Sequence, residues 1–148
     1  MPIKVLHVRS GPACTILALA HPLPDSKPDP CPTLAFILEE QKANEKELLK
    51  LAALLTRTAD FGPPMDETKF RKLSGGDDIY EFKTSGGLRL LCFKDGTQLI
   101  ICTHGITKSP KKRFQGEMQA AENARRDYFA AKVSKTLLYG PLPRKKLK

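Results

Sequence analysis

The spacing of apolar residues predicts strands near the start and in the middle of the chain. Residues 3–8 and 15–20 are short strand candidates, separated by a Ser-Gly-Pro break. Three further apolar runs, at residues 79–82, 88–93 and 97–103, are divided by glycine-containing turns. These three runs predict an antiparallel meander, the simplest sheet for consecutive strands joined by short turns.

Helical spacing predicts two helices before the meander and one after it. Apolar residues recur at helical intervals over residues 33–42, and Asn44 followed by Glu47 has the form of a capping box for a second helix. Pro63-Pro64 ends that helix. Ser109-Pro110 supplies a cap and a first-turn proline for a last helix that runs to about residue 135. The expected fold class is therefore α+β, with an N-terminal strand, two helices, a three-strand meander and a C-terminal helix.

The turn residues predict how the meander strands pair. Asp95-Gly96 between apolar runs favours a two-residue type I′ turn. Period-2 alternation then places Cys92 and Cys102 on opposite faces, which argues against a disulfide, and places His104 on the face of Arg89. A three-residue loop at residues 85–87 would set Lys83 beside Arg89, with Glu81 on the same face. The turn at Asp95-Gly96 predicts the pairs Lys94 with Thr97, Phe93 with Gln98, Leu91 with Ile100 and Arg89 with Cys102.

Charge is concentrated in the second half of the chain. The 148 residues carry a net charge of +9, but residues 1–68 sum to −2 and residues 69–148 to +11. A basic chain of this size suggests a polyanionic partner, most often nucleic acid, and the alternative is an ordinary solvated cationic surface. The asymmetry favours a localised binding surface.

The length and the apolar runs exclude several classes of protein. A chain of 148 residues forms one domain, and apolar runs of about eight residues are too short to span a bilayer. Residues 13–20, preceded by Lys4 and Arg9, resemble a short secretion signal, but a buried strand is the preferred interpretation. The four cysteines show no metal-ligand spacing and suit a reducing compartment. We therefore expect a cytoplasmic protein with no membrane segment and no structural zinc.

Cationic residues gather in three segments that this topology can bring together. The catalytic motifs of P-loop enzymes, α/β-hydrolases and zinc proteases are absent from the sequence. Three converging cationic clusters would instead form a phosphate-binding surface, although each cluster taken alone could be a solvated face. Arg89 stands out as a charge inside an otherwise apolar strand. The clusters are Lys69, Arg71 and Lys72; Lys83 and Arg89; and Lys108, Lys111, Lys112 and Arg113.

Several of these segments resemble one family of proteins. Residues 79–93 and 100–108, the Ser-Pro-Lys-Lys run into the last helix, and residues 31–38 resemble RelE/ParE-superfamily toxins, in particular their phage-derived, HigB-like branch. The resemblance covers roughly residues 13–131. It implies a toxin domain at residues 13–136, with an N-terminal extension at residues 1–12 and a basic tail at residues 137–148.

The resemblance implies a ribosome-dependent mRNA endonuclease that uses no metal or other cofactor. Such enzymes direct the RNA's own 2′-hydroxyl at the adjacent phosphate, which needs a base, cations and an acid. Arg89 matches the family's phosphate-stabilising arginine, Lys83 a second basic strand residue and Lys108 the basic residue of the turn. His104 is a candidate for proton transfer, although by pattern alone a structural histidine is the commoner case. Glu81 could act as a base or pair with Arg89, and pairing is favoured.

The chain departs from the founding toxins at the positions that transfer protons. Those proteins carry lysines where this chain has Ile79 and Glu81, and a tyrosine where it has Phe114 or Gln115. The resemblance implies mRNA on the ribosome and a helix-turn-helix antitoxin as partners. Two other functions stay open at this point: a ParE-like inhibitor of an enzyme such as a gyrase, and a non-catalytic RNA-binding or partner-binding module.

Overall fold

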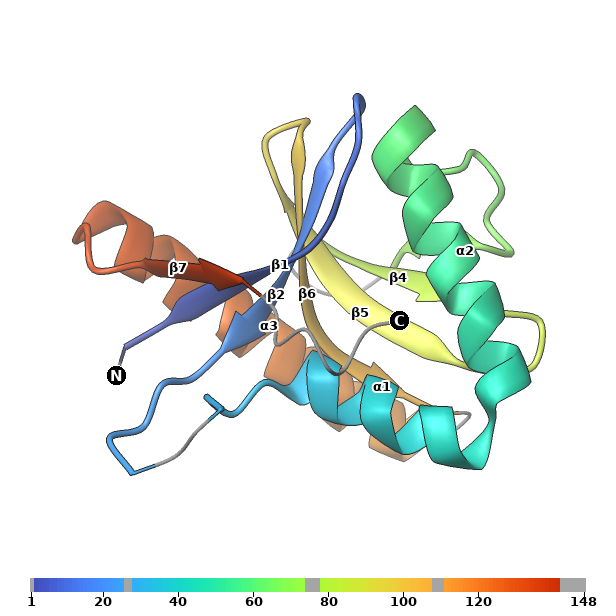
Figure 1. Cartoon of the computed structure of the whole chain (residues 1–148), viewed down its shortest axis with the longest axis horizontal. Helices are drawn as coiled ribbons and strands as arrows, with labels where there is room; N and C mark the ends of the chain where they lie inside the picture. The colour runs from blue at the N-terminus through green and yellow to red at the C-terminus, as the bar shows by residue number, and fades with distance from the viewer. Residues whose placement is uncertain (1, 26–27, 74–77, 108–110, 142–148) are drawn as a thin grey trace.

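The computed structural model describes residues 2–25, 28–73, 78–107 and 111–141, and the side chains of residues 111–114 lie outside the description. The helices and the meander strands form where the hydrophobic pattern predicted them (Figure 1). In chain order the elements are β1 (Lys4–Ser10), β2 (Thr15–Ala20), α1 (Pro32–Ala43), α2 (Glu45–Phe61), β3 (Phe70–Lys72), β4 (Ile79–Lys83), β5 (Arg89–Asp95), β6 (Leu99–Ile106), α3 (Lys111–Val133) and β7 (Leu138–Pro141).

The described residues build one mixed sheet of seven strands in the order β3-β4-β5-β6-β2-β1-β7. The α+β class is confirmed, and the strand candidates at residues 3–8 and 15–20 form β1 and β2, but the expected three-strand meander is only part of this larger sheet. β2 pairs with β6 and β1 with β7 in parallel, and the other neighbours are antiparallel. The sequence did not predict β3 and β7, because strands of three and four residues are too short to show a clear alternation.

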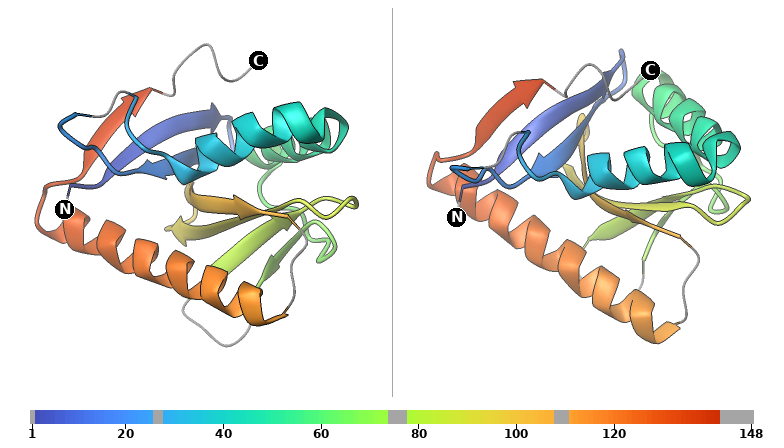
Figure 2. Two further views of the ribbon diagram at one scale, coloured as in Figure 1. Left: turned by 90° about the horizontal axis from the view of Figure 1, so that it is seen from below. Right: turned by 60° about the horizontal axis from the view of Figure 1, so that its bottom comes forward.

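Helices cover both faces of the sheet. Figure 2 shows α1 and α2 on one side and α3 on the other, and alternating strand residues supply a separate core to each side. Leu90 and Phe82 pack toward α1 and α2, whereas Leu91 and Phe93 pack toward α3. Tyr128 docks α3, because its ring meets the edge of Phe93 at 5.2 Å between centroids. We call the two sides of the sheet the α1/α2 face and the α3 face.

β2 links the N-terminal hairpin to the meander. Its residues are buried, apart from the half-buried Thr15, and Thr15–Ala18 lie beside Leu99–Cys102 of β6. The structure therefore confirms the strand interpretation of residues 15–20. None of the described helices is long and apolar enough to cross a membrane.

The β5–β6 connection differs from the predicted turn. Asp95 pairs with Leu99, so three residues rather than two connect the strands. A type I′ turn needs positive φ at both central residues, but here only Gly96 has one (φ 74°) and Asp95 does not. The Asp95 side chain instead accepts hydrogen bonds from Tyr128 and Lys132 of α3, both at 2.6 Å. The pairs predicted from the turn are wrong: Phe93 faces Ile101, Leu91 faces His104, Arg89 faces Ile106, and Lys94 faces Ile100.

A bulge at Thr103 changes the faces of β6 residues. Cys92 faces Cys102, and Leu91 faces His104, so Thr103 is the additional residue. The predicted placement of the two cysteines on opposite faces is therefore wrong, because directly paired residues share a face; both are buried free thiols. His104 lies on the face of Arg89, as predicted. In the observed register it does so only because the extra residue Thr103 shifts the alternation by one position.

Candidate phosphate-binding and proton-transfer site

The centre of the candidate site is a carboxylate between two arginines on neighbouring strands. Glu81 of β4 is fully buried on the α3 face, and its Oε2 accepts a hydrogen bond from Arg71 Nε of β3 at 2.5 Å. Its Oε1 lies 3.5 Å from a terminal guanidinium nitrogen of Arg89 on β5. The structure thus shows the pairing of Glu81 with Arg89 that the sequence favoured, and adds Arg71 as a second partner.

The Glu81 carboxylate accepts a hydrogen bond from Arg71 and lies at ion-pair distance from Arg89. The side chains of Arg71 and Arg89 are 39% and 27% exposed, whereas that of Glu81 is 0% exposed. The buried carboxylate therefore orients Arg71 through a hydrogen bond and attracts Arg89 electrostatically, while part of each arginine side chain reaches solvent. An arginine fixed in this way is suited to bind phosphate oxygens, because its orientation is set before the ligand arrives.

Lys83 lies beside Arg89, as the three-residue loop predicted. The two residues are direct partners across β4 and β5, and Gly87 takes the positive φ (99°) that this loop requires. They border a shallow pocket of about 260 Å³ at the β4–β5 turn. Within the described part of the chain Lys83 forms no ion pair, so its ammonium group can meet an anion from solvent.

His104 lies near Arg89 on the same face. It faces Leu91, two residues along β5 from Arg89, and such diagonal neighbours have Cα atoms about 7–8 Å apart. Its Nε2 is 3.4 Å from Oε1 of Glu117 on α3, and its Nδ1 is 3.1 Å from the Thr103 hydroxyl. Burial lowers the pKa of His104, although Glu117 opposes this effect. The imidazole is therefore neutral at neutral pH and able to accept a proton.

The turn that carries Lys83 toward Arg89 is held by α2. Asn44 caps this helix as predicted, since its Oδ1 lies 3.4 Å from the Glu47 nitrogen. The Glu47 carboxylate does not complete a capping box; it accepts the backbone N–H of Gly86 instead. The pKa of Glu47 is lowered mainly by a hydrogen bond from the Thr84 hydroxyl and, to a smaller extent, by a hydrogen bond from Lys50. Glu47 therefore positions the β4–β5 turn.

The remaining predicted residues are distributed more widely than the sequence suggested. Strand alternation directs Lys72 away from Arg71, and its Nζ pairs with Asp78 at 2.8 Å. Lys69 is exposed just before β3 and lies beside α2. Lys108 falls outside the described residues. Lys111, Lys112 and Arg113 form the first turn of α3, and their side chains are not described.

The structure also identifies functional candidates to which the sequence assigned no such role. Glu117 contacts His104 across the gap between α3 and β6, and Glu47 contacts the β4–β5 turn from 39 residues away. The spacing of residues along the sequence could not predict either contact, because each depends on how a helix packs on the sheet. No group of three or more potential metal ligands occurs among the described residues.

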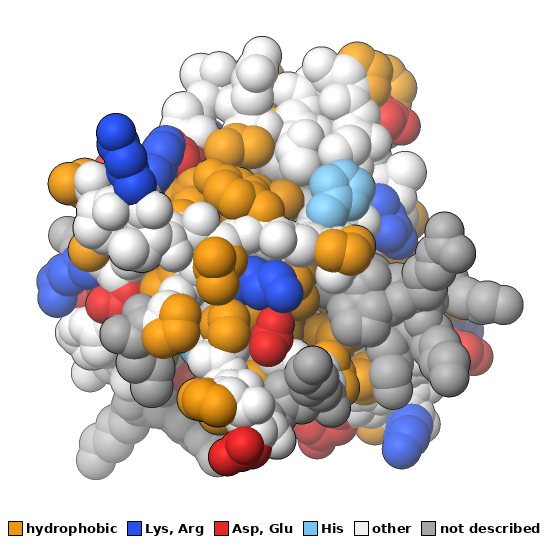
Figure 3. All heavy atoms as spheres, turned by 60° about the vertical axis from the view of Figure 1, so that its left-hand side comes forward, with side chains coloured by type: hydrophobic (Ala, Val, Ile, Leu, Met, Phe, Trp, Pro, Cys, Tyr) orange, Lys and Arg blue, Asp and Glu red, His pale blue; other side chains and the backbone are white. Residues whose placement is uncertain are grey.

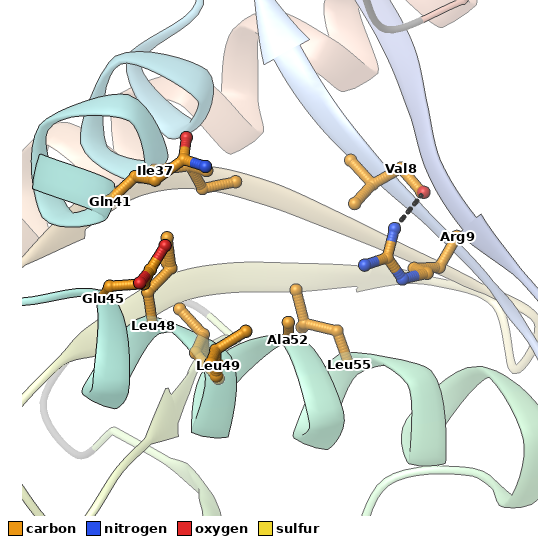
Figure 4. Close-up of a pocket in the computed structure, with 10 residues that line it drawn as sticks. Val8, Arg9, Ile37, Gln41, Glu45, Leu48, Leu49, Ala52 and Leu55 are labelled. Atoms are coloured by element: carbon orange, nitrogen blue, oxygen red, sulfur yellow. Dashed lines mark hydrogen bonds between the residues drawn. The ribbon is translucent and has the colours of Figure 1, made fainter. Parts of the chain in front are cut away.

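A separate apolar pocket of about 70 Å³ lies between α1, α2 and β1. Figure 4 shows Ile37, Leu48 and Leu55 around it, with Arg9 at its rim donating to the Val8 carbonyl at 3.3 Å. The face in Figure 3 likewise shows isolated Lys and Arg side chains among hydrophobic and acidic ones. That face also shows a histidine beside a cationic side chain (Figure 3). The α3 face differs because its arginine and its histidine are each paired with a carboxylate, Glu81 and Glu117.

Comparison with protein-family models identifies the family of this chain. A family model described as "Phage derived protein Gp49-like (DUF891)" matches residues 38–126, which is more than half of the chain. The matched region contains Glu81, Arg89, His104 and Glu117. No curated protein matches the chain.

Proposed function

Because this chain belongs to the phage-derived Gp49-like family, a RelE-like toxin family, we propose that it is the toxin of a type II toxin–antitoxin pair. We place it in the HigB-like branch and assign it ribosome-dependent cleavage of mRNA. An antitoxin of the helix-turn-helix class, with an acidic segment that competes for the cationic face, is the partner that this function requires.

The observation that carries the proposal is the placement of an anchored arginine and a neutral histidine on one face of the sheet. Arg89 forms an ion pair with the buried Glu81, and His104 lies beside Glu117 and the Thr103 hydroxyl. Phosphate binding and proton transfer are the two requirements of RNA cleavage by an internal hydroxyl. A protein that only binds RNA has no need of the second.

The proposed reaction forms a bond between the RNA 2′ oxygen and the adjacent phosphorus and breaks the bond from phosphorus to the 5′ oxygen. His104 accepts the 2′-hydroxyl proton, and Glu117 stabilises the resulting imidazolium. Arg89 stabilises the charge that develops on the phosphate oxygens. Lys83, beside Arg89, donates a proton to the leaving 5′ oxygen. The products are a 2′,3′-cyclic phosphate and a free 5′-hydroxyl.

The proposal is tested by induced expression of the chain in a bacterial host, with and without the product of the neighbouring gene. We expect growth arrest, new transcript ends within coding regions, and loss of both with Arg89→Ala but not with the exposed control Arg126→Ala. Growth arrest with unchanged transcripts, dependent on residues of α1 and α2, would point instead to a ParE-like inhibitor. An absence of arrest would leave only a passive binding module.

A further inference from the structure

A second cationic surface lies beside the candidate site, in a groove between α2, the segment before β3, and the β4–β5 turn. The groove has a volume of about 440 Å³, and the elements that border it lie side by side in Figures 1 and 2. Its described lining contains four cationic side chains and no carboxylate. The lining residues are Lys50, Ala53, Leu54, Arg57, Thr68, Lys69, Lys83, Thr84 and Ser85.

Most of these cations are available to a ligand. Among the described residues, Arg57, Lys69 and Lys83 have no carboxylate within ion-pair distance, whereas Lys50 Nζ lies 3.0 Å from Glu47 and 3.1 Å from the Ser85 hydroxyl. The nearby Asp66 accepts the Thr68 backbone N–H and hydroxyl at 2.9 and 2.6 Å. Within the described part of the chain, Arg57, Lys69 and Lys83 thus form no direct ion pair. The pKa of Asp66 is lowered by its hydrogen bonds from Thr68 and, to a smaller extent, by the charge of nearby Lys69.

The groove is continuous with the proposed reaction site. Lys83 lines both this groove and the shallow pocket that contains Arg89. On α2, Lys50 and Arg57 are seven residues apart, which is two helical turns or about 10 Å along the axis. A polyanion bound at Arg89 can thus pass Lys83 at the β4–β5 turn and reach the cations of α2.

Apolar surface in and beside the groove favours nucleic acid over an acidic peptide. Ala53 and Leu54 contribute apolar area to the lining, and the Phe61 ring, 78% exposed, lies 5.8 Å from the Arg57 guanidinium. Unpaired RNA bases stack on such rings while cations follow the backbone, and stacking contributes about 1–3 kcal/mol per base. An acidic peptide would use the charges but leave the ring exposed.

We infer that this groove binds the single-stranded RNA segment that flanks the cleavage site, with Arg57 and Lys69 contacting its phosphates. The inference rests on the proposed function, because it assigns the groove to the same substrate. It adds Lys50 and Arg57, which come from the acidic half of the sequence, to the RNA-binding surface. Phosphate contacts of this kind supply affinity without sequence preference.

The test is the affinity of the full chain for a fluorescently labelled single-stranded RNA, measured by anisotropy over a range of salt concentrations. The groove variant is Arg57→Ala/Lys69→Ala, and its charge-matched control is Lys42→Ala/Lys46→Ala; all four residues are exposed, and neither control residue lines the groove. We expect the groove variant to bind about tenfold more weakly and its salt slope to fall by about 1.4, while the control binds as the wild type does.

Other outcomes overturn the inference. Equal affinity of the groove variant and the control would show that RNA does not use the groove, and so would a wild type that binds no RNA. If the groove variant lost affinity for polyglutamate but kept its affinity for RNA, the occupant would be an acidic protein segment. Thermal unfolding of both variants checks that they are folded.

Failure of this inference and failure of the proposed function give different results. If only the groove assignment is wrong, the groove variant still cuts transcripts and Arg89→Ala does not. If only the nuclease assignment is wrong, transcripts stay intact with the wild type, yet the groove variant still shows the weaker RNA affinity.

Discussion

At the scale of single residues, the sequence predicted the groups that stand out within a strand but not their partners. Arg89 was identifiable as a charge in an apolar run, and its pairing with Glu81 followed from the β4–β5 loop. Arg71 and Glu117 could not be placed in the same way. Arg71 contacts Glu81 only because the three-residue strand β3 pairs with β4, and Glu117 contacts His104 only because α3 packs on the sheet.

The first prediction concerns the buried carboxylate. Glu81→Ala removes the anion that two arginines share, so it should lower the free energy of unfolding by about 3 kcal/mol, the low end for a broken buried pair because both arginines reach solvent. Urea unfolding at pH 7 measures this loss, and Glu67→Ala, at an exposed glutamate, is the control. A loss no larger than that of the control would show that Glu81 does not anchor the arginines.

The second prediction concerns the pH dependence of stability. The pKa of His104 is lower in the folded state than in the unfolded state, where it is about 6.5. At pH values between these two pKa values, the unfolded chain therefore binds more protons than the folded chain. The contribution of His104 to stability is therefore complete above about pH 6.5 and is lost as the pH falls toward the folded pKa. Urea unfolding between pH 5 and 7.5 should show this slope in the wild type and a smaller slope in His104→Gln. An unchanged slope would contradict the burial of a neutral imidazole.

At the scale of elements, periodicity predicted the helices and the longer strands, whereas connections and short strands depended on tertiary contacts. The Asp95-Gly96 turn illustrates this limit. Its residues favour type I′, but Asp95 is engaged by Tyr128 and Lys132 of α3. We attribute the three-residue connection to this docking contact. The register and the Thr103 bulge that together place His104 near Arg89 could not be read from local sequence.

The third prediction concerns the β4–β5 turn. A Cβ atom at Gly86 would lie 2.2 Å from the Glu47 carboxyl carbon, so Gly86→Ala must displace either the turn or Glu47. We expect a loss of about 1–3 kcal/mol in stability and reduced toxicity, because Lys83 and Arg89 flank this turn. The clash should be relieved in Glu47→Ala/Gly86→Ala, so the losses in the double variant should be less than additive. Additive losses would contradict the proposed contact.

A matched glycine substitution separates this clash from a general effect of alanine. Gly116 lies in α3 with nothing within 4 Å of an added Cβ. Gly116→Ala should therefore raise the free energy of unfolding by about 0.5–1 kcal/mol through the greater helix propensity of alanine. The opposite signs of the two substitutions can be measured in the same urea titration.

At the scale of the whole molecule, the net charge of +9 indicates a polyanionic partner but not the surface that binds it. Dividing the sequence into an acidic and a basic half suggested that the second half alone binds the polyanion. The fold changes this conclusion, because α2 places Lys50 and Arg57 beside Lys69 and Lys83. Cations from both halves meet in one groove, which only the packing of α2 beside β3 and the β4–β5 turn could reveal.

The central claim is that Arg89 and His104 act on one phosphate. Purified protein mixed with ribosomes carrying a defined mRNA, followed by chemical analysis of the new RNA ends, tests it most directly. We predict fragments with a 2′,3′-cyclic phosphate and a 5′-hydroxyl, and a rate that falls by about 10²–10³-fold in Arg89→Ala while Arg126→Ala cuts normally. Intact mRNA with the wild type, or equal cleavage by Arg89→Ala, would contradict the account.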